Sequence, residues 1–225
     1  MLIFYYYVFS LCIIGYGYFL LSFLKIDTNS LGYIGLSGLS FLIFISYSTS
    51  IFFAHDYKFN SFVILLGLIL FSFFLYKKFR FIKYDMKIFL IFFSLLLIFI
   101  LVGKNHDDFP YYHFPYSHLL TQYSHPFGVG WLNNGFRNPS SLFFLNSLFY
   151  LPLIDYYSFH LSPAYFLGFS NLILFKIIFD KNIFKEIKFI NFLSLTIFLF
   201  INIFFYRLAE HGTDRSGQII ILILV

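Results

Sequence analysis

The sequence predicts an all-α fold, a polytopic bundle of helices that spans a membrane. Three observations predict it: 60% of the 225 residues are hydrophobic and only 11% are charged, the mean hydropathy is +0.83, and the apolar residues form long stretches. A soluble domain carries about 25% charged residues to cover its core, so an ordinary soluble protein is excluded. The single cysteine, Cys12, lies in an apolar stretch, which excludes a disulfide framework and a cysteine metal site within this chain.

Residues 1–103 contain four apolar stretches, each of which predicts a transmembrane helix. They are residues 2–24, 31–54, 62–76 and 88–103. A helix that crosses about 30 Å of hydrocarbon takes roughly 17 to 25 residues. The third stretch is short, so we expect Lys77 and Lys78 to extend it to the interface with their aliphatic stems. In the second stretch, Gly32, Gly35 and Gly38 predict close packing against a neighbouring helix.

Residues 104–160 form a predicted extracytoplasmic loop. Its last part, residues 142–157, is apolar, but it is only 16 residues long and has Pro152 and Asp155 near its end. A helix that lies in the membrane interface below the loop suits this segment better than a span.

Residues 161–225 contain two further predicted spans, at 163–179 and 189–206. The last apolar run begins at residue 218 and reaches residue 225, which is too short a distance to cross a membrane. We therefore expect this chain to be the N-terminal fragment of a longer protein whose last helix is truncated here.

The basic residues predict the orientation, because short cytoplasmic loops accumulate Lys and Arg. The cluster at residues 77–87 is therefore expected inside, together with Lys25 and the segment 176–188. Residues 104–141 and 207–217 are then outside, as are all seven histidines. We expect an integral protein of the bacterial inner (cytoplasmic) membrane whose chemistry lies on the outer face. The net charge of +5 reflects this sorting and does not indicate a nucleic-acid partner.

The first polar cluster on the outer side covers residues 104–118 and contains the adjacent carboxylates Asp107 and Asp108. Adjacent carboxylates repel each other, which favours a shared proton or a bound cation, as in a general base or a metal ligand. Two prolines in the cluster restrict the backbone so that Asp108 and His113 hold a fixed relation. The alternative is an interfacial loop in which Tyr and His anchor the chain at headgroup depth.

The second polar cluster covers residues 207–217 and contains both signs of charge, with Arg207, Glu210, Asp214 and Arg215. The inside segments use Lys almost alone, so arginine here suggests bidentate binding of a phosphate or carboxylate. A helix cap at Asp214 with an exposed ion pair to Arg215 explains the pattern equally well.

The third polar cluster covers residues 131–141, in which Asn, Gly and Pro predict turns and Ser140 is placed to cap the following helix. Arg137 is the one Lys or Arg of the outer loop after Lys104, which makes it a candidate phosphate contact. A snorkelling anchor in the headgroup region is the alternative explanation for it.

This arrangement resembles the GT-C superfamily of polytopic membrane glycosyltransferases. An acidic pair follows a transmembrane helix, aromatic and interfacial segments precede the next span, and an Arg/Asp loop comes two spans later. It is most similar to the protein-mannosyltransferase and aminoarabinose-transferase branch, and to uncharacterised bacterial membrane proteins with an Asp-x-x-Tyr-His-type outer loop. The resemblance covers residues 88–225, and the first three spans are additional relative to that branch.

The resemblance implies transfer of a sugar from a polyprenyl-phosphate carrier in the bilayer to a glycan, lipid or protein acceptor on the outer side. The acceptor hydroxyl has to lose a proton, and Asp108 or Asp107 is the candidate base, with Asp214 as the third candidate catalytic residue. The departing phosphate gains negative charge, which Arg, Lys or a divalent cation stabilises, and no residue is assigned to hold such a cation. The candidate substrate-binding residues are His113, Arg137, Arg207, Glu210 and Arg215.

A transporter or metal-handling membrane protein is the alternative of a different class. Its ligands would come from the same outer loop, namely His106, Asp107, Asp108, His113 and His118. Against it, the middle of each predicted span lacks Asp, Glu, Lys and Arg, where a conduction path usually places one. Asn202 is polar and alone in the last of these spans. A purely structural membrane module is the third option.

Overall fold

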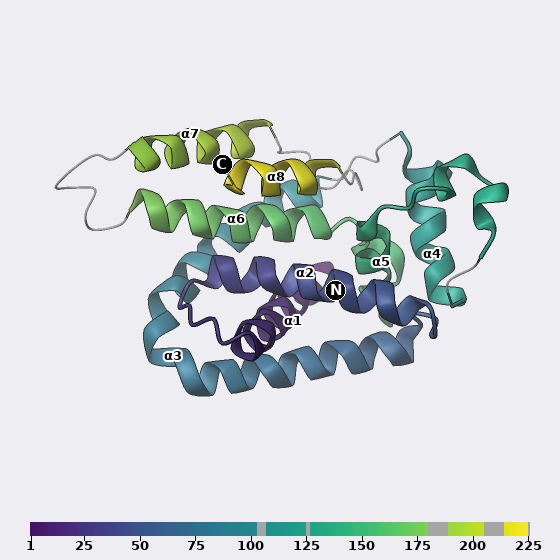
Figure 1. Ribbon diagram of the computed structural model, residues 1–225, viewed down its shortest axis with the longest axis horizontal. Coiled ribbons are helices and arrows are strands. Elements are labelled where there is room, and N and C mark those ends of the chain that lie inside the picture. Colours follow the sequence, from purple (N-terminus) through teal and green to yellow (C-terminus); the bar gives the residue numbers. More distant parts are fainter. Residues whose placement is uncertain (103–106, 125–126, 180–188, 205–213, 225) are drawn as a thin grey trace.

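The computed structural model describes residues 1–102, 107–124, 127–179, 189–204 and 214–224, and it confirms the all-α fold class (Figure 1). Among these residues, one isolated bridge between Leu151 and Asp155 is the sole extended pairing. The longer helices are α1 (Leu2–Phe23), α2 (Leu31–Ser50), α3 (Tyr57–Leu101), α4 (Phe114–Gln122), α5 (Ser141–Ser147), α6 (Ser162–Ile178), α7 (Phe189–Phe204) and α8 (Asp214–Leu224).

Helices α1 and α2 form where the first two spans were predicted, and their backbones touch. A Cβ atom added to Gly17 would lie 1.8 Å from the carbonyl oxygen of Ile34, and one on Gly38 would lie 1.9 Å from that of Ile13. Gly32 and Gly35 also face α6 closely, Gly32 at Ile173 and Phe169 and Gly35 at the ring of Phe169. The predicted use of these small residues for helix packing is therefore confirmed.

Helix α3 corrects one prediction, because the third and fourth spans are not separated by a loop. They belong to one continuous helix of 45 residues, which would be about 68 Å long if it were straight. Residues 77–87 contain neither Gly nor Pro, so nothing in this segment ends the helix. Figure 1 shows that α3 curves back on itself in its middle, and the hydroxyl groups of α1 reach both halves, Tyr16 at Val63 O and Tyr6 at Phe93 O.

Five segments are long and apolar enough to cross a membrane, by length and composition. They are Leu2–Phe23, Leu31–Ser50, Tyr57–Arg80, Ile82–Leu101 and Tyr156–Ile178. Helix α7 is apolar but shorter in the described part of the chain. The chain therefore has the helices of a polytopic membrane protein.

Most of the described lysines gather at one end of this bundle, and the described histidines of the outer loop lie at the other. At the basic end, Lys78 pairs with Asp27 at 2.6 Å, and Lys176 pairs with Asp85 at 3.2 Å. At the opposite end, the backbone N–H of His55 donates to Leu120 O of α4 at 2.8 Å. In Figure 1 the bend of α3 and helix α4 mark these two ends.

The interfacial helix predicted at residues 142–157 is shorter than predicted, and its position in the membrane interface stays a prediction. Helix α5 has seven residues and is capped by Ser140, whose hydroxyl accepts the N–H of Leu142 at 3.3 Å, as the sequence predicted. All residues from Leu142 to Phe149 are buried inside the protein. Pro152 disfavours helix at the preceding residue, and a tight turn with positive φ at Leu153 and Asp155 follows.

One further correction concerns α7. Asn202 of α7 is not alone, because it forms a reciprocal amide pair with Asn171 of α6, at 2.9 and 2.8 Å. Helix α8 covers Asp214–Leu224 in the described part of the chain and includes the apolar run predicted from residue 218.

Candidate functional site

The candidate site is built around Tyr112, at the end of the bundle opposite the basic residues. Asp108 precedes a short π-helical turn, η1 (Phe109–His113), which leads directly into α4. Turns of this kind occur frequently at functional sites. The Tyr112 hydroxyl lies four residues from Asp108 along this turn and donates to its Oδ2 at 3.0 Å. The half-buried Asp108 carboxylate is therefore oriented by a neighbouring phenol.

The third polar cluster packs directly on the Tyr112 ring. A Cβ atom added to Gly135 would lie 2.5 Å from Cγ of Tyr112, so only a glycine lets the backbone come this close. Asn133 fixes the contact from both sides, because its Nδ2 donates to Tyr111 O at 2.9 Å and its Oδ1 accepts the N–H of Gly135 at 2.8 Å. Two polar clusters that the sequence separates thus form one surface.

Asp214 of the second polar cluster also acts on Tyr112. Burial raises the pKa of Tyr112, the hydrogen bond to Asp108 raises it further, and the negative charges of Asp108 and Asp214 add to the increase. Asp214 is exposed in the first turn of α8, and its charge makes the smallest of these contributions. Two polar clusters therefore pack together at one tyrosine, and the charge of a third helps to keep it protonated as a hydrogen-bond donor.

His113 lies on the inner side of this site. It is buried, with its ring 4.4 Å from that of Tyr112 in an edge-on contact and 5.2 Å from the ring of Phe143. Its predicted roles in orienting the site or binding a phosphate stay predictions. Asp107, by contrast, is exposed.

Arg137 lies beside the site and lines a neighbouring hollow of about 600 Å³. Its Nε donates to Gly130 O at 3.3 Å. The hollow has aromatic walls that include Tyr116 and Phe136, and both belong to the small core on which Tyr112 packs. Phe136 follows Gly135 in the sequence, so the hollow adjoins the Tyr112 surface.

Several predicted site residues either lie outside the residues that the structure describes or have other neighbours within it. Arg207 and Glu210 lie outside the described residues, as do Lys104 and His106. Arg215 is half-buried next to Asp214 in α8. The described residues contain no group of three or more His, Cys, Asp or Glu side chains that could hold a metal ion. His118, one of the predicted metal ligands, stacks on Phe114 at 5.5 Å between ring centroids.

Sequence reasoning missed the central residue, Tyr112, and the buried hydrogen bonds of His55 with Ser147 and Thr49. The Tyr-His pair after the acidic residues was visible, but Tyr112 had no distinguishing signal among 19 tyrosines. His55 is fully buried, and its ring nitrogens meet Ser147 Oγ at 2.6 Å and Thr49 Oγ1 at 3.1 Å. Burial lowers the pKa of His55 to about 4, so this histidine is neutral at pH 7.

Asp155 also gains a partner that spacing alone could not suggest. The hydroxyl of Tyr57 donates to its carboxylate, and the Tyr57 ring stacks on that of Tyr150 at 4.4 Å. This contact ties the start of α3 to the turn after α5. Comparison with known proteins finds no family model, no curated protein and no solved structure that matches this chain.

Proposed function

We propose that this chain is a glycosyltransferase-like membrane protein, which transfers a sugar from a polyprenyl-phosphate carrier to an acceptor on the extracytoplasmic side. One observation carries the proposal: the Asp108 carboxylate is held by the Tyr112 hydroxyl at 3.0 Å, in a surface formed by two polar segments that the sequence separates. Sugar transfer of this kind requires carboxylates and phosphate-binding groups in one site at the membrane surface.

The proposed reaction makes one bond and breaks one. The acceptor oxygen attacks the anomeric carbon, the bond from that carbon to the carrier phosphate breaks, and the phosphate leaves with the electron pair. The proton of the acceptor hydroxyl goes to the carboxylate of Asp108, which acts as general base. Tyr112 is a positioning residue, because its hydrogen bond to Oδ2 fixes the plane of that carboxylate.

The negative charge on the departing phosphate needs a cation nearby. Arg215 is the described candidate, since it follows Asp214 in the first turn of α8 and is half-buried. A guanidinium group matches the geometry of phosphate oxygens and keeps its charge at any physiological pH. Asp214 beside it orients the guanidinium group in this proposal.

The test is a transfer assay on membranes that contain the complete protein, with a radiolabelled sugar linked to polyprenyl phosphate. Asp108→Asn keeps size and hydrogen bonding but abolishes the base, so transfer should fall by about a hundredfold or more. The matched control is Asp27→Asn, which changes an exposed acid at the other end of the bundle and should leave transfer unchanged. Wild-type transfer by the Asp108→Asn protein would reject the proposal, as would metal uptake that depends on Asp108 in the absence of any sugar transfer.

A further inference from the structure

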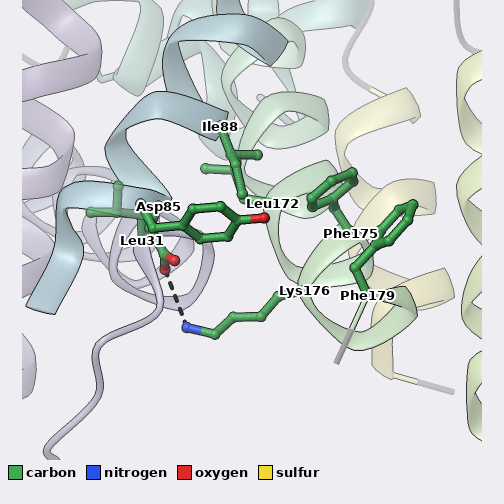
Figure 2. Close-up of a pocket in the computed structure, with 8 residues that line it drawn as sticks. Leu31, Asp85, Ile88, Leu172, Phe175, Lys176 and Phe179 are labelled. Carbon is green, nitrogen blue, oxygen red and sulfur yellow. Dashed lines mark hydrogen bonds and ion pairs between the residues drawn. The ribbon is translucent and has the colours of Figure 1, made fainter. Parts of the chain in front are cut away.

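A cavity of about 340 Å³ opens at the basic end of the bundle, far from Tyr112, between α3 and α6. Figure 2 shows that its lining is divided into two parts. Ile88, Leu172, Phe175 and Phe179 form an apolar wall on one side, and Asp85 and Lys176 form a charged edge on the other.

The apolar wall suits a hydrocarbon chain. It is contributed by two helices, and the rings of Phe175 and Phe179 pack together with centroids 4.4 Å apart. Ile88 of α3 and Leu172 of α6 continue the wall towards the interior of the bundle. Pockets with apolar walls and a small number of polar groups at one edge are typical of sites for amphiphilic ligands.

The charged edge supplies a hydrogen-bond donor to the mouth of the cavity. Lys176 Nζ donates to Asp85 Oδ2 at 3.2 Å, and the lysine side chain keeps 52% of its surface exposed while the aspartate keeps only 16%. An ammonium group has three N–H donors, so Lys176 can hold Asp85 and still bind a second acceptor. Asp85 thus fixes the position of the ammonium group over the apolar wall.

The surroundings of the cavity are strongly positive. Besides Lys176, the described cations at this end are Lys25, Lys77, Lys78, Arg80, Lys83 and Lys87. The described acids there are Asp27 and Asp85, each already paired with a lysine. A basic segment between two apolar half-helices lies at the depth of the lipid headgroups and attracts anionic lipid.

We propose that this cavity binds an anionic phospholipid of the phosphatidylglycerol type in the leaflet at the basic end of the bundle. One hydrocarbon chain lies against the apolar wall, and the lipid phosphate accepts a hydrogen bond from Lys176 Nζ. The ammonium group of phosphatidylethanolamine would enter the same positive field and be repelled, so the headgroup that fits is anionic. This inference needs no transfer chemistry and stands apart from the proposed function.

The test uses a fluorescent reporter inside the cavity. Trp131 is the one tryptophan of the sequence, so the double variant Trp131→Phe, Phe179→Trp carries a single indole in the apolar wall. The protein is reconstituted in vesicles that contain phosphatidylglycerol or phosphatidylethanolamine with brominated chains. At equal mole fraction, quenching should indicate at least about fivefold tighter association of phosphatidylglycerol. Adding Lys176→Gln should reduce this preference by about fivefold or more, because the lipid phosphate loses a charge-assisted hydrogen bond inside the cavity.

Lys83→Gln is the matched control, because Lys83 is an exposed lysine of α3 that does not line the cavity. It should leave the preference unchanged. Native mass spectrometry of the wild-type protein with the two lipids repeats the comparison without any substitution in the wall. Equal association of both lipids, an equal effect of Lys83→Gln and Lys176→Gln, or displacement of the lipid by soluble glycerol phosphate would each overturn the proposal.

Discussion

Tyr112 shows how a single side chain can join segments that the sequence keeps apart. Its hydroxyl holds Asp108, its ring lies under Gly135, and its pKa is raised in part by the charge of Asp214. Because its pKa is raised, Tyr112 carries no charge at neutral pH. Its proposed role is therefore to orient the base, and this role can be separated from substrate binding.

Tyr112→Phe tests that separation. The substitution keeps the ring on Gly135 but removes the hydrogen bond to Asp108. A hydrogen bond to a charged group contributes about 1.5 to 3 kcal/mol, so kcat for sugar transfer should fall by about tenfold or more. KM for the lipid-linked sugar should stay as in the wild type, and the melting temperature should fall only slightly, because the folded protein loses the same hydrogen bond. A rise in KM with an unchanged kcat would show that Tyr112 binds substrate and does not position the base.

His55 predicts a pH dependence of stability. The folded protein keeps this histidine neutral with a pKa near 4, whereas the unfolded chain has the ordinary value of 6.5. Its contribution is therefore fully present above pH 6.5 and is lost as the pH falls towards 4, because only the unfolded state then takes up the proton. Between pH 7 and pH 5 the loss should be about 2 kcal/mol.

The measurement for His55 is denaturant unfolding of the purified protein in detergent at both pH values. His55→Gln is less stable at pH 7, since it loses a ring that is hydrogen-bonded to Ser147 and Thr49. It should nevertheless lose about 2 kcal/mol less than the wild type between pH 7 and pH 5. The same pH dependence in both proteins would assign the effect to other groups.

At the scale of the helix, α6 and α7 are joined by an amide pair between Asn171 and Asn202. Both side chains donate and accept, at 2.9 and 2.8 Å, and Asn202 also donates to Phe198 O within its own helix. Inside a membrane protein such pairs contribute about 0.6 to 2 kcal/mol, since unpaired amides in hydrocarbon are costly.

A double-mutant cycle tests the amide pair. Asn171→Ala and Asn202→Ala should each destabilise the protein, and the double variant should be less destabilised than the sum by about 1 kcal/mol. The readout is unfolding in mixed detergent micelles. Thr196→Ala is the control, because the hydroxyl of Thr196 bonds within α7, at Phe192 O, and its effect should simply add to that of Asn171→Ala. Additivity for the asparagine pair itself would contradict the coupling.

The helices could be predicted from sequence because their signal is local. Apolar stretches of sufficient length located α1, α2, both halves of α3 and α6 within a few residues. The continuity of α3 could also have been predicted from the local sequence, since residues 77–87 contain neither Gly nor Pro to end a helix. The Lys cluster there was taken for a loop because it is charged, but charge alone does not break a helix.

The site could be predicted only in part, for a different reason. The candidate residues Asp108 and Asp214 were visible as rare acids beside apolar stretches, and the charges of both raise the pKa of the same phenol. Their connection through Tyr112 and Gly135 depends on contacts across the fold, as does the tie between Tyr57 and Asp155. Such contacts leave no periodic trace in the chain, so no pattern of spacing reveals them.

At the scale of the whole molecule, the bundle separates its two kinds of polar chemistry. Carboxylates, tyrosines and histidine gather around Tyr112 at one end, and the Lys-rich bend of α3 with the lipid-sized cavity lies at the other. Membrane insertion that follows the positive-inside rule would place these ends in different aqueous phases.

Cysteine labelling in intact cells tests this placement. A cysteine in place of Ser124, which is exposed after α4, should react with an impermeant thiol reagent added outside. A cysteine in place of Lys83 should react only after the membrane is permeabilised. The native Cys12 is fully buried and provides the unreactive background. Labelling of the Lys83 position in intact cells would invert the orientation.

The backbone contact between α1 and α2 has a genetic consequence. Every change in the first or second base of a glycine codon installs a side chain or a stop codon. At positions 17 and 38, any such side chain meets a carbonyl oxygen less than 2 Å away. Gly217 has no atom of another group within 4 Å of the same point. In a library of single-base variants that is selected for folded protein, amino-acid changes at Gly17 and Gly38 should therefore be lost, while those at Gly217 remain.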